Sequence, residues 1–164
     1  MFISPTYGKR KSLELIEDVA RFIETDPKAN FRLIIGSDSH VHGANGKSNL
    51  KLVTAIVIHK VGHGGKYFWQ SKHLAKPHSI RDKIYTETYA SLETAQSFLP
   101  KINKRLNGHA NYALEIHIDV GRVGETRDMI KEVVGMVTGN GYTAITKPDS
   151  YGASKVADKH TWNF

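Results

Sequence analysis

The chain contains no cysteine, which excludes disulfide bonds and any zinc site held by thiolates. No apolar run approaches the roughly 20 residues that a membrane-spanning helix needs. The N-terminal segment MFISPTYGKRKS lacks the apolar core of a secretory signal. Linkers, internal repeats and low-complexity tracts are also absent. We therefore expect a cytoplasmic protein with no membrane partner, folded as a single domain over residues 1–164.

Positive charge is in excess. Lysine and arginine number 23 against 16 aspartate and glutamate, which gives a net charge of +7. This balance is compatible with a nucleic-acid partner, although many basic proteins bind none. The hydrophobic fraction of 40% and the charged fraction of 24% are those of an ordinary globular domain.

Apolar periodicity divides the chain into helices and strands. The pattern predicts three strands in succession, followed by alternating helices and strands. The expected helices cover residues 11–25, 79–99, 126–137 and 148–159, and the expected strands cover residues 31–37, 50–61, 66–72, 112–120 and 141–147. Residues 40–49 (HVHGANGKSN) are rich in glycine and asparagine, which predicts a turn.

This element order predicts an α/β fold. The first three strands should form an antiparallel meander, and each later strand–helix–strand unit favours a parallel, right-handed crossover. The result is a mixed five-stranded sheet flanked by helices, with residues 1–28 as an N-terminal helical extension outside the core.

Acidic residues stand at unusual places in this basic chain. Asp38 ends the apolar run in FRLIIGSDSH, and Asp119 ends another in YALEIHIDVG. A carboxylate at the buried end of a strand is costly unless it is paired, hydrogen-bonded or bound to a cation. Strands 31–37 and 112–120 should be neighbours in the sheet, so these two carboxylates should lie close together.

The strand order and the acids resemble the ribonuclease H fold. The strings GSDSH, HIDVGRVGET, GY…KPDS and ASKVAD are similar, more narrowly, to the YkuK-type ribonuclease H-like family. The resemblance implies four acidic metal ligands, which we assign to Asp38, Glu87, Asp119 and Asp158. Glu93 and Asp82 compete with Glu87, and Asp38 or Asp119 could instead cap a loop or a helix.

Such a set of acids suits phosphodiester hydrolysis. Two Mg²⁺ or Mn²⁺ ions about 3.5–4 Å apart can activate water and stabilise the leaving oxygen, and both ions prefer oxygen ligands. The sequence therefore predicts a metal-dependent nuclease acting on RNA, RNA–DNA hybrid or DNA. A dimeric junction-resolvase-like nuclease and a non-catalytic nucleic-acid-binding module remain as alternatives, and the oligomeric state stays open.

Three histidines are candidates for orienting the metal-bound acids: His40, His117 and His160. The HxH string of His40 and His42 also resembles the zinc motif of amidohydrolase-type barrels. Those barrels typically have about 200 residues or more, so that reading does not suit this chain. Each histidine could equally be a partly buried or exposed residue without a functional role.

Basic side chains could contact substrate phosphates. Candidates beside the scissile phosphate are Arg122 and Arg127, and candidates on a wider track include Lys72 and Arg81 together with Lys76, Lys83, Lys101, Lys104 and Arg105. The DVGRVGET string also resembles the phosphate loop of actin-like ATPases. Those ATPases bind nucleotide between two domains, whereas a single domain is expected here.

Overall fold

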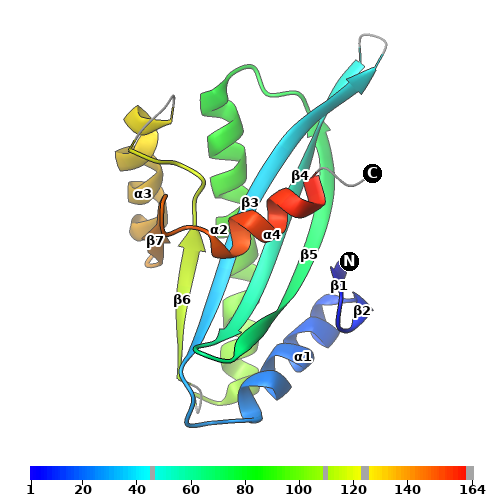
Figure 1. Cartoon of the computed structure of the whole chain (residues 1–164), viewed down its shortest axis with the longest axis vertical. Coiled ribbons are helices and arrows are strands. Elements are labelled where there is room, and N and C mark those ends of the chain that lie inside the picture. Colours follow the sequence, from blue (N-terminus) through cyan, green and yellow to red (C-terminus); the bar gives the residue numbers. More distant parts are fainter. Residues whose placement is uncertain (45–46, 109–110, 123–125, 162–164) are drawn as a thin grey trace.

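The computed structural model describes residues 1–44, 47–108, 111–122 and 126–161 (Figure 1). Its centre is a mixed sheet of seven strands, not the five that we predicted. The two additional strands are short N-terminal segments of three residues each. The strands are β1 (Phe2–Ser4), β2 (Gly8–Arg10), β3 (Phe31–Ala44), β4 (Lys47–Lys60), β5 (Gly64–Ala75), β6 (Tyr112–His117) and β7 (Thr143–Ile145).

The sheet order is β2-β1-β5-β4-β3-β6-β7. Strands β3, β4 and β5 form the antiparallel meander expected from the sequence. Strand β6 pairs with β3 in parallel, and β7 pairs with β6 in parallel. The predicted turn at residues 40–49 is wrong at both ends, because β3 continues to Ala44 and β4 begins at Lys47. Residues 45–46 lie outside the described residues.

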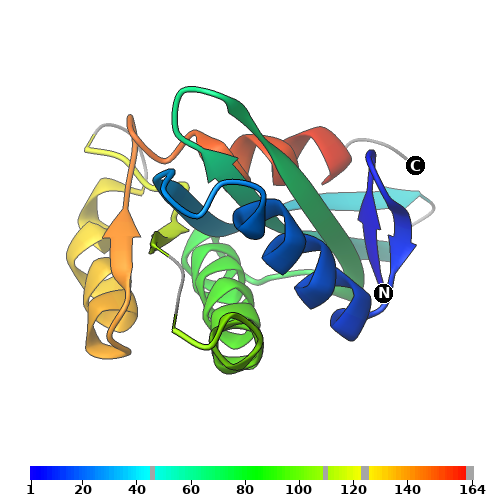
Figure 2. The ribbon, with the colours of Figure 1, turned by 90° about the horizontal axis from the view of Figure 1, so that it is seen from below.

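Helices cover both faces of this sheet (Figures 1 and 2). Helix α2 is longer than expected, because it runs through Pro100 to Leu106 instead of ending near Leu99. Among the described residues, no helix is both long enough and apolar enough to cross a membrane. The helices are α1 (Ser12–Glu24), α2 (Ile80–Leu106), α3 (Ile130–Gly139) and α4 (Gly152–Thr161), with a 3₁₀ turn η1 (Arg127–Met129) before α3.

The main core lies on the face covered by α1, α2 and α3. Alternate β3 residues such as Leu33 and Ile35 point into it, because successive strand residues face opposite sides. Helix α4 covers the other face, where Ala153 and Ala157 pack on Ile34 and on strand β4 (Figure 2). Small alanines let α4 approach the sheet closely.

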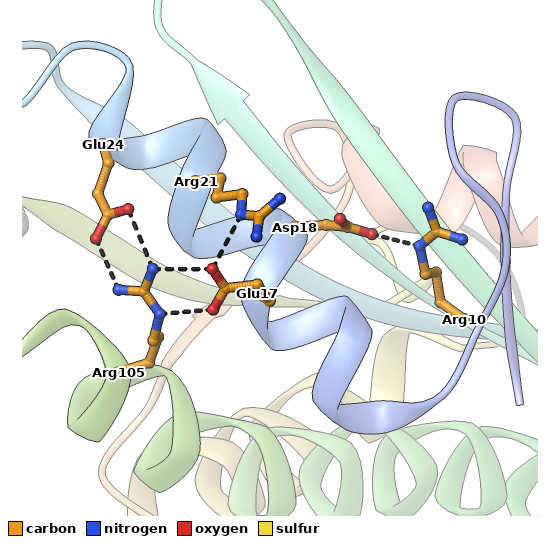
Figure 3. Close-up of polar contacts among 6 residues, drawn as sticks. All are labelled: Arg10, Glu17, Asp18, Arg21, Glu24 and Arg105. Carbon is orange, nitrogen blue, oxygen red and sulfur yellow. Dashed lines mark hydrogen bonds and ion pairs between the residues drawn. The ribbon is translucent and has the colours of Figure 1, made fainter.

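The N-terminal helix forms as predicted, but its description as an extension outside the core is not confirmed. Val19 and Ile23 on α1 are buried in the same core as α2. Figure 3 shows that Arg105 on α2 also binds two carboxylates of α1, with Nε 2.6 Å from Glu17 Oε2 and Nη1 2.7 Å from Glu24 Oε1. Arg105 therefore joins the two helices, and its place on a phosphate track stays a prediction.

The contact between α4 and β3 depends on Gly36. A Cβ atom at this position would lie 3.0 Å from Ala153 Cβ, 3.1 Å from the carbonyl oxygen of His117 and 3.2 Å from the amide nitrogen of Ser154. Two of these neighbours are backbone atoms, so they cannot move aside without shifting α4 or β6.

We predict that Gly36→Ala destabilises the fold by about 1–3 kcal/mol, as overpacking commonly does. The matched control is Gly135→Ala in the interior of α3, where a Cβ meets nothing within 4 Å. Alanine there should raise the stability by about 0.5–1 kcal/mol. Urea denaturation of both variants measures the two effects, and an unchanged midpoint for Gly36→Ala would contradict the close α4–β3 packing.

Candidate functional site

Strand β3 loses one of its neighbours partway along its length. It pairs with β6 only from Phe31 to Gly36, whereas it pairs with β4 as far as Ala44. After His117 the chain follows β7 instead, with the Ile118 amide donating to the Ile145 carbonyl at 2.9 Å. Among the strands of the described ranges, none pairs with this edge of β3 beyond Gly36. The sheet therefore opens at the carboxyl ends of its two central parallel strands, where open α/β sheets commonly bind ligands.

Three of the four predicted acids meet at this opening. Asp38 comes from β3, Asp119 from the segment after β6, and Asp158 from α4. All three line one pocket of about 260 Å³. Lys147 and Lys155 line it too. Asp38 lies within β3, so the alternative that it caps a loop is wrong.

The fourth acid, Glu87, approaches from the opposite face of the sheet. It lies on α2 and is only 4% exposed. Ser39, the neighbour of Asp38, donates a hydrogen bond from Oγ to Glu87 Oε1 at 2.6 Å. The two competitors on the same helix are less buried, since Asp82 is partly exposed and Glu93 forms an exposed ion pair with Lys72.

Lys83 joins Glu87 to the other acids. Its Nζ lies 2.6 Å from Glu87 Oε1 and 3.6 Å from Asp38 Oδ1. The residue is one turn before Glu87 on α2, so the helix itself directs both side chains to the same place. Lys83 thus connects Glu87, on the sheet face covered by α2, with Asp38, on the face covered by α4. It does so at the unpaired edge of β3.

Lys147 forms a second lysine–carboxylate pair at the opening. Its Nζ lies 2.8 Å from Asp119 Oδ1. The two side chains are 56% and 34% exposed, in contrast to 5% for the Glu87 side chain. The solvent-exposed pair should hold its partners more loosely than the pair inside the protein.

Burial changes the proton affinities of the central groups. Burial raises the pKa of Glu87 to about 7, against the lowering effect of Lys83 and Ser39. Burial also raises the pKa of Asp38, to which the nearby Asp158 and Asp119 carboxylates add. Burial alone would lower the pKa of Lys83, but the adjacent Glu87 carboxylate outweighs it, so the pKa is raised. Lys83 is therefore positively charged at neutral pH.

The donor chemistry suits Mg²⁺ or Mn²⁺, because carboxylate oxygens are the ligands that these ions prefer. The arrangement is less suited to two ions. Within the part of the chain that the structure describes, which includes all four predicted acids, no three acidic or histidine side chains are grouped closely enough to hold a metal ion. Lysine ammonium groups contact three of the carboxylates. An ion bound to Asp38, Glu87 or Asp119 would therefore lie close to a lysine ammonium group.

The contacts that the structure gives for the three candidate histidines are with residues other than the four predicted acids. His117 Nε2 is 3.0 Å from Glu115 Oε2, and its Nδ1 accepts from the Gly152 amide at 3.3 Å. His160 stacks on Trp69 with ring centroids 4.2 Å apart. His40 contacts the ring of His42 on the same strand. Their predicted role in orienting metal ligands stays a prediction.

The candidate substrate contacts are spread over the surface. Arg122 and Arg127 are exposed in the chain between Asp119 and α3. Arg81 pairs with Glu132 at 2.7 Å, and Lys72 pairs with Glu93 at 3.4 Å. The last two are therefore engaged with carboxylates of the chain itself.

Sequence reasoning missed the part that lysines play in the site. The sequence pattern predicts Lys83 only as a phosphate contact, and it predicts no functional role for Lys147 or Lys155. The available signal was the spacing of Lys83 and Glu87, because residues four apart on a helix are neighbours. Lys147 gave no comparable signal, since it reaches Asp119 only through the pairing of their backbones, in which the Lys147 amide donates to the Val120 carbonyl at 2.8 Å.

Comparisons with known proteins agree with this architecture. A model of the family described as ribonuclease H-like matches residues 14–162. The chain is also 32% identical to the uncharacterized protein YkuK of Bacillus subtilis (strain 168), over 90% of this chain and 89% of that protein. No solved structure matches the chain.

The chain belongs to the ribonuclease H-like family, and its resemblance to YkuK-type proteins is confirmed. The family match begins within α1, at residue 14, so this helix is included in the matched region. Membership indicates a function connected with nucleic acid, without specifying a substrate or a reaction.

The raised pKa of Glu87 gives a testable pH dependence. A carboxyl group that titrates near 7 when folded and near 4.5 when unfolded stabilises the fold below pH 4.5 and loses that contribution as the pH rises to about 7. The loss amounts to about 3 kcal/mol at most. Urea denaturation between pH 4.5 and 7.5 should show this fall in the wild type and not in Glu87→Gln.

The control for this measurement is Glu93→Gln, which changes an exposed carboxylate of the same helix and should retain the wild-type pH dependence. Equal pH profiles for the wild type and Glu87→Gln would show that Glu87 is not a buried titrating group.

Proposed function

We propose that this protein is a metal-dependent nuclease that hydrolyses phosphodiester bonds of RNA, RNA–DNA hybrid or DNA in the cytoplasm. The observation that carries the proposal is the pocket in which Asp38, Asp119 and Asp158 meet from three different elements. These carboxylates lie at the opening of the central parallel strands. Ribonuclease H-like membership supports nucleic acid as the substrate class.

Basic and aromatic residues beside the pocket support the same substrate. A neighbouring pocket of about 290 Å³ shares Asp119, Lys147 and Lys155 with the acidic one and adds Tyr151. Lysine ammonium groups attract phosphates, and an exposed tyrosine ring offers a surface for base stacking. Both features would hold a strand next to the carboxylates.

Within this proposal the acids have distinct parts. Asp38 and Asp119 would supply the central oxygen ligands, and Asp158 would complete the set in the pocket. Glu87 would ligate or orient one ion and its attacking water. Two Mg²⁺ or Mn²⁺ ions, when bound, would supply charge neutralisation at the phosphate and a lower pKa for water. Lys147 and Lys155 would bind the phosphate and keep it over the pocket.

A second candidate is a nucleic-acid-binding module without catalysis. It is favoured by the lysine contacts of Asp38, Glu87 and Asp119, because acids that are already neutralised would not repel a bound phosphate. The two candidates differ in what the acids do once nucleic acid is bound, and a cleavage assay separates them.

We predict that Asp38→Asn abolishes metal-dependent cleavage. The assay uses labelled single-stranded RNA, RNA–DNA hybrid, duplex DNA and a four-way junction with Mg²⁺ or Mn²⁺. Loss of several kcal/mol of transition-state stabilisation should lower the rate by about 100-fold or more. The matched control is Asp82→Asn, which removes the same charge from a partly exposed position in the first turn of α2 and should cleave at the wild-type rate.

Binding of these substrates without cleavage by the wild type would reject the nuclease in favour of the binding module. Cleavage confined to the four-way junction would favour the resolvase-like alternative.

A further inference from the structure

One oxygen of Glu87 and one oxygen of Asp38 already face polar or positively charged groups of the chain. Glu87 Oε1 receives the Lys83 ammonium group at 2.6 Å and the Ser39 hydroxyl at 2.6 Å. Lys83 also reaches Asp38 Oδ1 at 3.6 Å. An oxygen with two such donors has no free direction for a cation. One donor must leave before Glu87 Oε1 can become a ligand.

Charge leads to the same conclusion. Glu87 is almost completely buried, and a buried carboxylate needs a compensating charge. Lys83 provides it from a side chain that is only 24% exposed. An ammonium group and a divalent ion on the same carboxylate repel each other, so Lys83 lowers the affinity of Glu87 and Asp38 for an ion.

The two lysine pairs of the site are unequal. Lys147 is 56% exposed and pairs with Asp119, which is itself partly open to solvent. An exposed pair of this kind contributes little, so an ion can displace Lys147 with little loss. Lys83 contacts two carboxylates, Asp38 and Glu87, and Glu87 is buried. Displacing Lys83 is therefore much harder than displacing Lys147.

Building on the nuclease proposed above, we infer that Lys83 is a built-in cation that competes with one of the two divalent ions for Asp38 and Glu87. In the free protein the lysine balances these acids. An ion reaches Asp119 and Asp158 first, and the ion at Asp38 and Glu87 binds only when Lys83 withdraws.

The test is Mn²⁺ binding to the whole chain, measured by isothermal titration calorimetry and by electron paramagnetic resonance of free Mn²⁺. Lys83→Gln should bind Mn²⁺ about tenfold more tightly or take up one additional ion, because an adjacent charge commonly changes the affinity of a site for a cation by this factor or more. The control is Lys104→Gln, which removes the same charge from an exposed position of the same helix. It should bind as the wild type does.

A double variant tests whether the gain depends on Glu87. Lys83→Gln combined with Glu87→Gln lacks both the competitor and its carboxylate, so it should lose the gain. Lys83→Arg keeps the positive charge and should retain the wild-type affinity.

Lys83→Gln could unfold, since it leaves Glu87 without its cation. A measurement on the wild type therefore accompanies it. Acetylation by a water-soluble active ester, followed by mass spectrometry, reports how accessible each amine is. Lys83 should react several times faster with saturating Mg²⁺ than without it, whereas the reaction of Lys104 should not change.

The outcomes separate the inference from the function on which it rests. The competition is overturned if the wild type and Lys83→Gln bind Mn²⁺ equally, or if Mg²⁺ does not change the acetylation rate of Lys83. Either result leaves the nuclease proposal intact. Absence of Mn²⁺ binding in every variant overturns the metal-dependent function and the competition together.

Discussion

The geometry of the site follows from one constraint: β3 extends several residues beyond the end of its parallel neighbour β6. Strand β3 keeps its antiparallel pairing with β4 to Ala44, but its other edge has no paired strand in the described chain after Gly36. Neighbouring residues of β3 face opposite sides of the sheet, so Asp38 turns toward α4 and Ser39 toward α2. In a closed sheet these two faces would be separate. At the open edge a single side chain, Lys83, can contact groups of both.

The second determinant is the balance of charge around that edge. The four predicted acids come from β3, α2, α4 and the segment after β6, and a nearby negative charge raises the pKa of a carboxyl group. The raised pKa of Asp38 records this repulsion together with burial. Lysines from α2 and from the segment after β7 offset it. Ammonium groups of the chain itself thus offset part of the negative charge of these acids.

The sequence predicted most of what local patterns and topology determine. The meander, the parallel neighbours and the convergence of Asp38 with Asp119 follow from apolar periodicity and crossover handedness. Strands β1 and β2 were missed because three residues are too few to show a period. The continuation of β3 was missed because glycine and asparagine there indicate a turn, whereas the pairing with β4 holds the segment extended. Helix α2 passes Pro100 because tertiary packing of Phe98 and Ile102 outweighs a lost backbone hydrogen bond.

The site was predicted less completely, since a lysine in a basic protein is most simply assigned to phosphate binding. Lys83 could have been assigned otherwise only by asking what neutralises Glu87, a carboxylate on the buried face of its helix. The two assignments are compatible if the lysine changes partners. A polyanion that approaches the pocket presents oxygens that can accept the ammonium group in place of Glu87. A lysine that turns to a phosphate leaves Glu87 free for an ion, so nucleic acid and metal would each favour the binding of the other, as reciprocal coupling between two ligands requires.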